Sequence, residues 1–90
     1  MFLSVDNDDY GVLTDADGRV IMYPVSAETE TGIVTCIVKE DDRPESPFIV
    51  DMAKGEVQRF RFRFKAPLGF DRSANLPDAY MHAIPLEELP

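Results

Sequence analysis

The chain has 90 residues, of which 44% are hydrophobic and 29% are charged, and its 17 acidic and 9 basic side chains give a net charge of −8. A chain of this length forms one domain with a small core, so we expect a single domain over residues 1–90. The acidic balance argues against nucleic-acid binding, for which a basic surface is usual, and favours a protein partner with a basic surface.

Two features indicate the compartment. No apolar run is long enough to cross a bilayer, and the N-terminal residues lack the basic and apolar regions of a signal peptide. Cys36 is the only cysteine, so an intramolecular disulfide cannot form. It lies in the apolar run 33–38, where a small buried side chain is expected. We therefore expect no membrane association and a cytoplasmic protein, in the host cytoplasm if the source is viral.

The N-terminal third predicts short strands and tight turns. Residues 2–5 fit a first strand, and the acidic cluster 6–9 fits the turn after it. The sequence Asp-Ala-Asp-Gly at 15–18 is a strong hairpin signal, because Asp-Gly suits the positive φ of tight turns. We expect this turn to join arms at 10–15 and 19–25.

The next segments alternate between polar loops and an apolar strand. Pro24 indicates that the second hairpin arm ends at an edge or a bulge. Residues 26–32 are polar, and residues 33–38 predict a buried strand. Residues 39–47 are rich in charge and contain two prolines, which predicts a surface loop.

The most regular pattern is the alternation of basic and aromatic residues over 59–65. Successive side chains of a strand point to opposite faces. The pattern therefore predicts one face with four cations, Arg59, Arg61, Arg63 and Lys65, and one with three rings, Phe60, Phe62 and Phe64. We expect the rings to be buried and the cations to stay in water. The cations repel one another, so either an anionic partner offsets them or acids on neighbouring strands do, such as Asp51, Glu40 or Glu28.

A hairpin is predicted before this strand. Residues 48–52 pair with 57–66 across a three-residue loop, 53–55, in which Gly55 takes the left-handed conformation. The resulting register, with Phe48 opposite Phe60, adds three side chains to the phenylalanine face: Phe48, Val50 and Met52. A slip of one residue would send these side chains to the opposite face.

The C-terminal third is less regular. Pro67 ends the central strand, and we expect 69–78 to be irregular. Residues 80–84 fit either a last strand or, with Pro77 at the first position, a short helical turn, and the strand is favoured because the rest of the chain is β. Hairpin-linked strands at this spacing predict an all-β fold, a small antiparallel sandwich or barrel of about six or seven short strands.

One window partly matches a calcium-binding loop. Asp6, Asp8 and Asp17 fall at positions 1, 3 and 12 of the EF-hand spacing, and Gly11 falls at its glycine position. Position 5 is tyrosine, the bidentate glutamate is missing, and no flanking helices are expected. An acidic turn is therefore the favoured interpretation, and a calcium site is the alternative.

No catalytic motif stands out. His82 is the only histidine, no serine or cysteine context indicates a triad, and no glycine-rich phosphate loop is present. Nothing selects a pair of carboxylates for acid–base catalysis from the 17 acids. We therefore expect no enzymatic activity and no cofactor, with a small hydrolytic domain as an alternative.

Taken together, the sequence predicts a small acidic, non-catalytic module that binds another protein, for instance an inhibitor that docks on a basic groove. The acidic segments 6–17 and 40–45 are the first candidate contact surface and the cationic face is the second. The candidate contact residues are Asp8, Asp9, Glu40, Asp41, Asp42, Arg59, Arg61, Arg63 and Lys65. The structural alternative is a self-assembling subunit of a larger particle, in which the cationic face of one copy meets the acidic loops of another.

Overall fold

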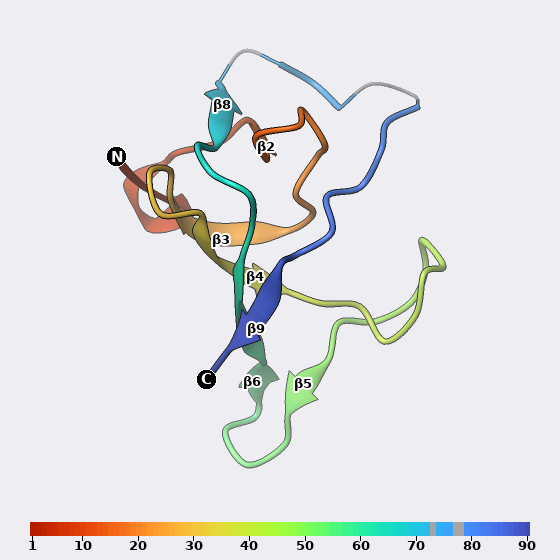
Figure 1. Ribbon diagram of the computed structural model, residues 1–90. Helices are drawn as coiled ribbons and strands as arrows, with labels where there is room; N and C mark the ends of the chain where they lie inside the picture. The colour runs from red at the N-terminus through yellow and green to blue at the C-terminus, as the bar shows by residue number, and fades with distance from the viewer. Residues whose placement is uncertain (73, 77–78) are drawn as a thin grey trace.

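Antiparallel sheets dominate the structure, a computed structural model that describes residues 1–72, 74–76 and 79–90 (Figure 1). The main sheet has the strand order β1-β3-β4-β7-β9. Its strands are β1 (Phe2–Ser4), β3 (Pro24–Glu28), β4 (Ile33–Ile37), β7 (Arg59–Arg63) and β9 (Glu87–Leu89).

Two small sheets complete the fold. β2 (Val12–Thr14) pairs with β8 (Gly69–Asp71), and β5 (Val50–Asp51) pairs with β6 (Glu56–Val57). The only helical element in the described residues is a single 3-10 turn, η1 (Val5–Asn7), so the predicted all-β class is confirmed. No helix among these residues has the length and apolar character that crossing a membrane requires.

Strand β7 lies inside the main sheet, as its alternating pattern predicts. It pairs with β4 so that Val34 lies opposite Phe62 and Cys36 lies opposite Phe60. Because paired residues point to the same side of a sheet, the rings share one face with these two small side chains. The opposite face carries the arginines.

The hydrophobic core lies on the phenylalanine face. Its buried residues are Leu3, Leu13, Ile21, Ala27, Val34, Cys36, Phe64 and Leu68. Burial of all three rings was predicted, but only Phe64 is buried, while Phe60 and Phe62 are half-buried. The β2–β8 pair lies at the end of β7 that leads to Phe64, and the β5–β6 pair lies at the other end (Figure 1). The three rings are therefore buried at the Phe64 end of the strand and only half-buried toward Phe60.

The predicted turn at 15–18 is present. The backbone N–H of Asp15 donates to the carbonyl of Arg19 at 2.9 Å, and Gly18 has φ +79°. The buried Asp15 carboxylate accepts the N–H groups of Asp17 and Arg19, each at 3.0 Å. The second arm is shorter than predicted, since it meets the first at one bridge and β2 pairs with β8 instead. A bulge begins at Pro24, as expected.

The register predicted for the next hairpin is wrong by one residue. Val50 pairs with Val57 and Asp51 pairs with Glu56, so the turn has four residues, 52–55. The Asp51 side chain accepts the N–H of Ala53 at 3.0 Å and so closes the turn early. Gly55 has φ +67°, which confirms its predicted left-handed conformation.

This shift changes where the hairpin side chains lie. Phe48, Val50 and Met52 were predicted to join the phenylalanine face. Instead Val50 and Met52 are exposed, and Phe48 meets the ring of Tyr23 edge-on at 5.1 Å. The hairpin projects beyond the end of the main sheet (Figure 1), so its apolar side chains cannot reach the core.

The C-terminal third contains two strands that were not predicted. Residues 69–71 of the segment expected to be irregular form β8, and residues 87–89 form β9. The segment 80–84, the predicted last strand, has a single parallel bridge between His82 and Val20. Pro77, the start of the alternative helical turn, lies outside the described residues.

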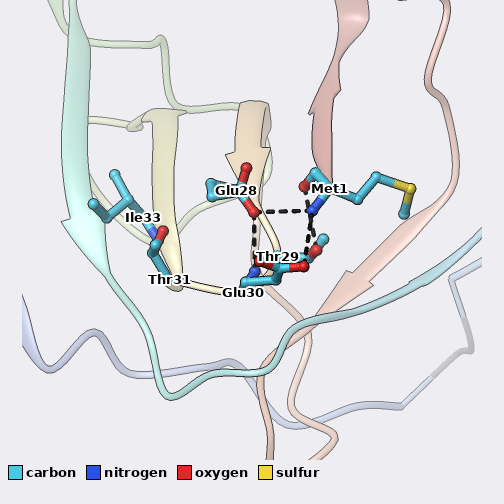
Figure 2. A network of polar contacts seen from close by, with 6 residues as sticks. All are labelled: Met1, Glu28, Thr29, Glu30, Thr31 and Ile33. Carbon is cyan, nitrogen blue, oxygen red and sulfur yellow. Dashed lines mark hydrogen bonds and ion pairs between the residues drawn. The ribbon is translucent and has the colours of Figure 1, made fainter.

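A polar network holds β1 on the edge of the sheet (Figure 2). The Met1 ammonium donates to the Glu28 carboxylate at 2.9 Å, and the N–H of Thr29 donates to the Met1 carbonyl at 3.0 Å. The same carboxylate accepts the N–H of Glu30 at 3.2 Å. The ammonium bond lowers the pKa of Glu28 and raises that of the Met1 ammonium. The Glu28 carboxylate therefore helps to hold β1 on the edge of the sheet.

Candidate functional site

Of the three acidic residues before β2, Asp9 is bonded into the fold, while Asp6 and Asp8 are exposed. Asp9 accepts the N–H of Ser4 at 3.0 Å and pairs with Arg72 at 2.7 Å, while its own N–H donates to the Ser4 carbonyl at 3.1 Å. The bond from Ser4 is the main cause that lowers the pKa of Asp9, and the Arg72 bond adds to it. Asp9 thus bonds both the N–H and the carbonyl of Ser4 at the end of the edge strand β1. Of the two candidate contacts in this segment, Asp8 remains exposed.

The three acids of the calcium alternative do not converge. Asp17 forms an ion pair with Lys65 at 3.1 Å, and Asp6 and Asp8 lie exposed in and after η1. Within the described ranges, no group of three or more His, Cys, Asp or Glu side chains is placed to hold a metal ion.

The acidic loop 40–45 is shaped by internal bonds. Arg43 clamps Asp41 through bonds of 2.8–3.1 Å, which is the main cause that lowers the pKa of Asp41. Lys39 donates to the Pro44 carbonyl at 2.7 Å. In the part of the chain that the structure describes, the carboxylates of Glu40 and Asp42 have no ion-pair partner, and both residues are exposed. These two and Glu45, which is likewise exposed and has no ion pair with a described residue, give the loop its outward negative charge.

The two acidic segments do not form one surface. Residues 6–9 lie beside β1, whereas the loop 40–45 projects on the opposite side of the molecule (Figure 1). A partner that binds both segments at once would have to span the whole domain, so we treat them as separate surfaces.

The loop 40–45 borders a groove of about 870 Å³ over the phenylalanine face. Cys36, Phe62 and Phe64 line its floor. The segment 39–44 contributes two acids and two cations to its lining, Asp41, Asp42, Lys39 and Arg43. The segment 80–85 contributes Tyr80, His82, Ala83 and Pro85. The groove exists because the core cover ends before Phe62, which leaves this ring half-buried.

Aromatic side chains are concentrated in this groove. The rings of Phe62 and Phe64 lie 6.3 Å apart, and the rings of Tyr80 and His82 stack at 5.2 Å. Tyr23 is also at the groove, with the Lys39 ammonium 5.2 Å from its ring centre. Such aromatic clusters favour burial against a partner over contact with water.

The groove does not supply an activated nucleophile. Burial raises the pKa of the Cys36 thiol to about 12, so the thiol is protonated at neutral pH. The ring of His82, which also lines the groove, stacks on Tyr80 at 5.2 Å. The Cys36 thiol is therefore not activated as a nucleophile at neutral pH.

The cations of β7 and the residues after it fall into two classes. Arg63 pairs with Glu87 at 3.1 Å, and Lys65 pairs with Asp17 at 3.1 Å. Among the described residues, Arg61 donates to one group, a main-chain oxygen of Pro90, the last residue of the sequence, at 3.4 Å. Arg59 has no ion pair with any described residue.

The acids that we expected to brace this face do not do so. Asp51 caps its own turn, Glu28 pairs with the Met1 ammonium, and Glu40 lies exposed in the loop after β4. The bracing acids are instead Glu87 and Asp17, which sequence reasoning missed. The expectation that acids on neighbouring strands offset the cations of this face is therefore only partly correct.

Sequence reasoning also missed the groove. Its walls come from segments about 40 residues apart in the chain, and no local pattern indicates that they face each other. The one available signal was the aromatic pair Tyr80 and His82, which alternate as in a strand.

Comparisons of this chain with protein-family models, with curated proteins and with solved structures found no match.

Proposed function

We propose that the protein is a non-catalytic binding module that captures a partner protein in the groove between the loop 40–45 and the segment 80–85. One observation carries this proposal: the phenylalanine face is left partly uncovered beside a charged loop. A ring that is half-buried in the free protein gains apolar contact when a partner side chain fills the space above it.

The groove chemistry favours one kind of partner segment. Its aromatic floor accepts an apolar or aromatic side chain. Lys39 and Arg43 also line the groove, and Arg43 pairs with Asp41, so Asp42, which has no ion-pair partner among the described residues, is the lining carboxylate that attracts a lysine or arginine. The net charge of −8 steers a basic partner toward the molecule and speeds association. We therefore propose an apolar side chain flanked by basic residues as the segment that binds, in a cytoplasmic partner.

The first experiment identifies the partner by capture on the tagged protein and then measures its affinity for three variants. Phe62→Ala removes a floor ring, and Asp42→Lys reverses a wall charge. Glu56→Lys is the matched control, because it makes the same charge change in the exposed hairpin away from the groove. We expect Phe62→Ala and Asp42→Lys to weaken binding at least about tenfold, equivalent to about 1.4 kcal/mol, and Glu56→Lys to leave it within about twofold.

Melting curves of each variant separate loss of binding from loss of fold. Equal affinity of Asp42→Lys and Glu56→Lys would show that overall charge, not the groove, governs binding. Recovery of the tagged protein alone, at a mass several times 10.1 kDa, would instead favour the self-assembling subunit.

A further inference from the structure

We propose that the opposite face of the main sheet is a second docking surface, centred on Arg59 and Arg61, for an extended acidic segment of a partner protein. Both arginines are exposed and lie two residues apart on β7. They point away from the phenylalanine face and hence away from the groove. The inference is therefore independent of the groove.

Among the described residues, the pairing of β7 places no side-chain carboxylate directly opposite either arginine. Arg61 lies between Thr35 on β4 and Leu89 on β9, and Arg59 lies opposite Ile37 on β4. The strand positions that could brace them thus carry uncharged side chains. Within the described ranges, Arg61 makes one hydrogen bond, a long contact of 3.4 Å with a main-chain oxygen of Pro90, the last residue of the sequence.

The contrast with other cations of the molecule is informative. Arg43, Arg63, Lys65 and Arg72 each hold a carboxylate at 2.7–3.1 Å. Within the described residues, the basic side chains without an ion pair are Arg59, Arg61 and three others that are dispersed along the chain, Arg19, Lys39 and Lys54. The chain has 17 acids for 9 basic residues, so acids are not scarce. Arg59 and Arg61 differ from those three because they lie two residues apart on one strand, and neither forms an ion pair with a described side-chain carboxylate, so together they keep an electrostatic attraction that these residues of the fold do not use.

The spacing defines the ligand. Alternate residues of a strand lie about 6.5–7 Å apart, so the two guanidinium groups match carboxylates at alternate residues of an extended peptide lying along β7. The half-buried side chains of Ile33, Ile37 and Leu89 flank the arginines on the same face and offer apolar contact to its other atoms.

A nucleic acid fits the surface less well. Its phosphates gain nothing from the aliphatic flank, the net charge of −8 repels a polyanion, and the aromatic rings on which bases could stack point to the other face. An acidic peptide uses both the cations and the flank.

The test is a titration, followed by fluorescence anisotropy at low salt, of a labelled peptide in which glutamate alternates with threonine. The comparison peptide has the same composition with its glutamates in one block. The test variant is Arg59→Gln/Arg61→Gln, and the matched control is Arg19→Gln/Lys54→Gln, which removes the same charge elsewhere. We expect the test variant to weaken binding of the alternating peptide at least tenfold and the control to stay within about twofold.

The proposal is overturned if both double variants weaken binding equally, if the blocked peptide binds as well as the alternating one, or if the wild-type protein binds neither. It is also overturned if a single-stranded oligonucleotide binds the protein and the peptide does not, with the oligonucleotide bound more weakly by Arg59→Gln/Arg61→Gln than by the control variant. The variant Phe62→Ala should leave peptide binding unchanged, so a failure of the groove proposal and a failure of this one are distinguishable.

Discussion

Gly32, in the turn before β4, offers a sharp test of the fold that positions both surfaces. Its φ is +79°, in the left-handed region that disfavours a side chain. A Cβ atom at this position would overlap the backbone carbonyl oxygen of Phe64 and lie 3.3 Å from the Cβ of Ala66. The Phe64 N–H also donates to the Gly32 carbonyl at 2.8 Å. The substitution Gly32→Ala therefore strains the turn and separates it from the end of β7.

The expected loss follows from these contacts. Left-handed backbone costs an alanine about 1–2 kcal/mol, and breaking the buried hydrogen bond costs about 1–3 kcal/mol. The lower entropy of the unfolded chain offsets about 0.4–1 kcal/mol of this. We expect Gly32→Ala to lower the free energy of unfolding by about 2–4 kcal/mol and the Tm by roughly 10–30 °C, at about 4–8 °C for each kcal/mol in a domain of this size.

The control is Gly55→Ala. Gly55 has φ +67°, but a Cβ there meets no atom within 4 Å, so only the backbone term applies. That variant should lose about 0–1.5 kcal/mol. The assay is thermal and urea unfolding followed by circular dichroism, with both variants measured beside the wild type. If the two variants melt within a few degrees of each other, the inference that a Cβ atom at position 32 clashes with the Phe64 carbonyl is wrong.

Two further predictions concern titratable groups. The pKa of Asp9 is lowered by the fold, so its contribution is present above the usual carboxyl pKa and is lost as the pH falls through the lowered value. Thermal melts from pH 2.5 to 7 should therefore show a steeper acid limb for the wild type than for Asp9→Asn, while the exposed control Asp8→Asn should follow the wild type. Cys36, whose pKa is raised to about 12, should react with iodoacetamide at pH 8 only as fast as the protein unfolds, and rapid labelling of the native protein would contradict its burial. The thiol ionises at a lower pH in the unfolded chain than in the folded protein. Its ionisation should therefore lower the free energy of unfolding as the pH rises above about 9.

The sequence predicted the elements whose pattern is local. The alternation at 59–65 is strong enough to define both faces of β7, and the Asp-Gly pair at 17–18 defines its turn. The hairpin register failed because two local signals compete. A glycine at 55 permits several loop lengths, and the side chain of Asp51 decides among them by capping the turn.

The strands β8 and β9 could not be predicted, because their residues carry no strand pattern. Gly-Phe-Asp and Glu-Glu-Leu form strands only where β2 and β7 supply partners. The candidate surfaces depend on the same non-local pairing. Sequence placed four cations on one face, but the pairing with Thr35 and Leu89 determines that no side-chain carboxylate of a neighbouring strand lies directly opposite Arg61.

Both candidate surfaces depend on the register of one strand. A shift of β7 by one residue would exchange its rings and its cations between the two faces. The residues that hold the register lie at the Phe64 end, where Phe64 bonds Gly32 and the Lys65 carbonyl accepts the N–H of Ala16 at 2.8 Å. A substitution that loosens this end should therefore weaken the groove and the arginine face together. Gly32→Ala should reduce both binding activities at temperatures where the protein is still folded, whereas Gly55→Ala should reduce neither.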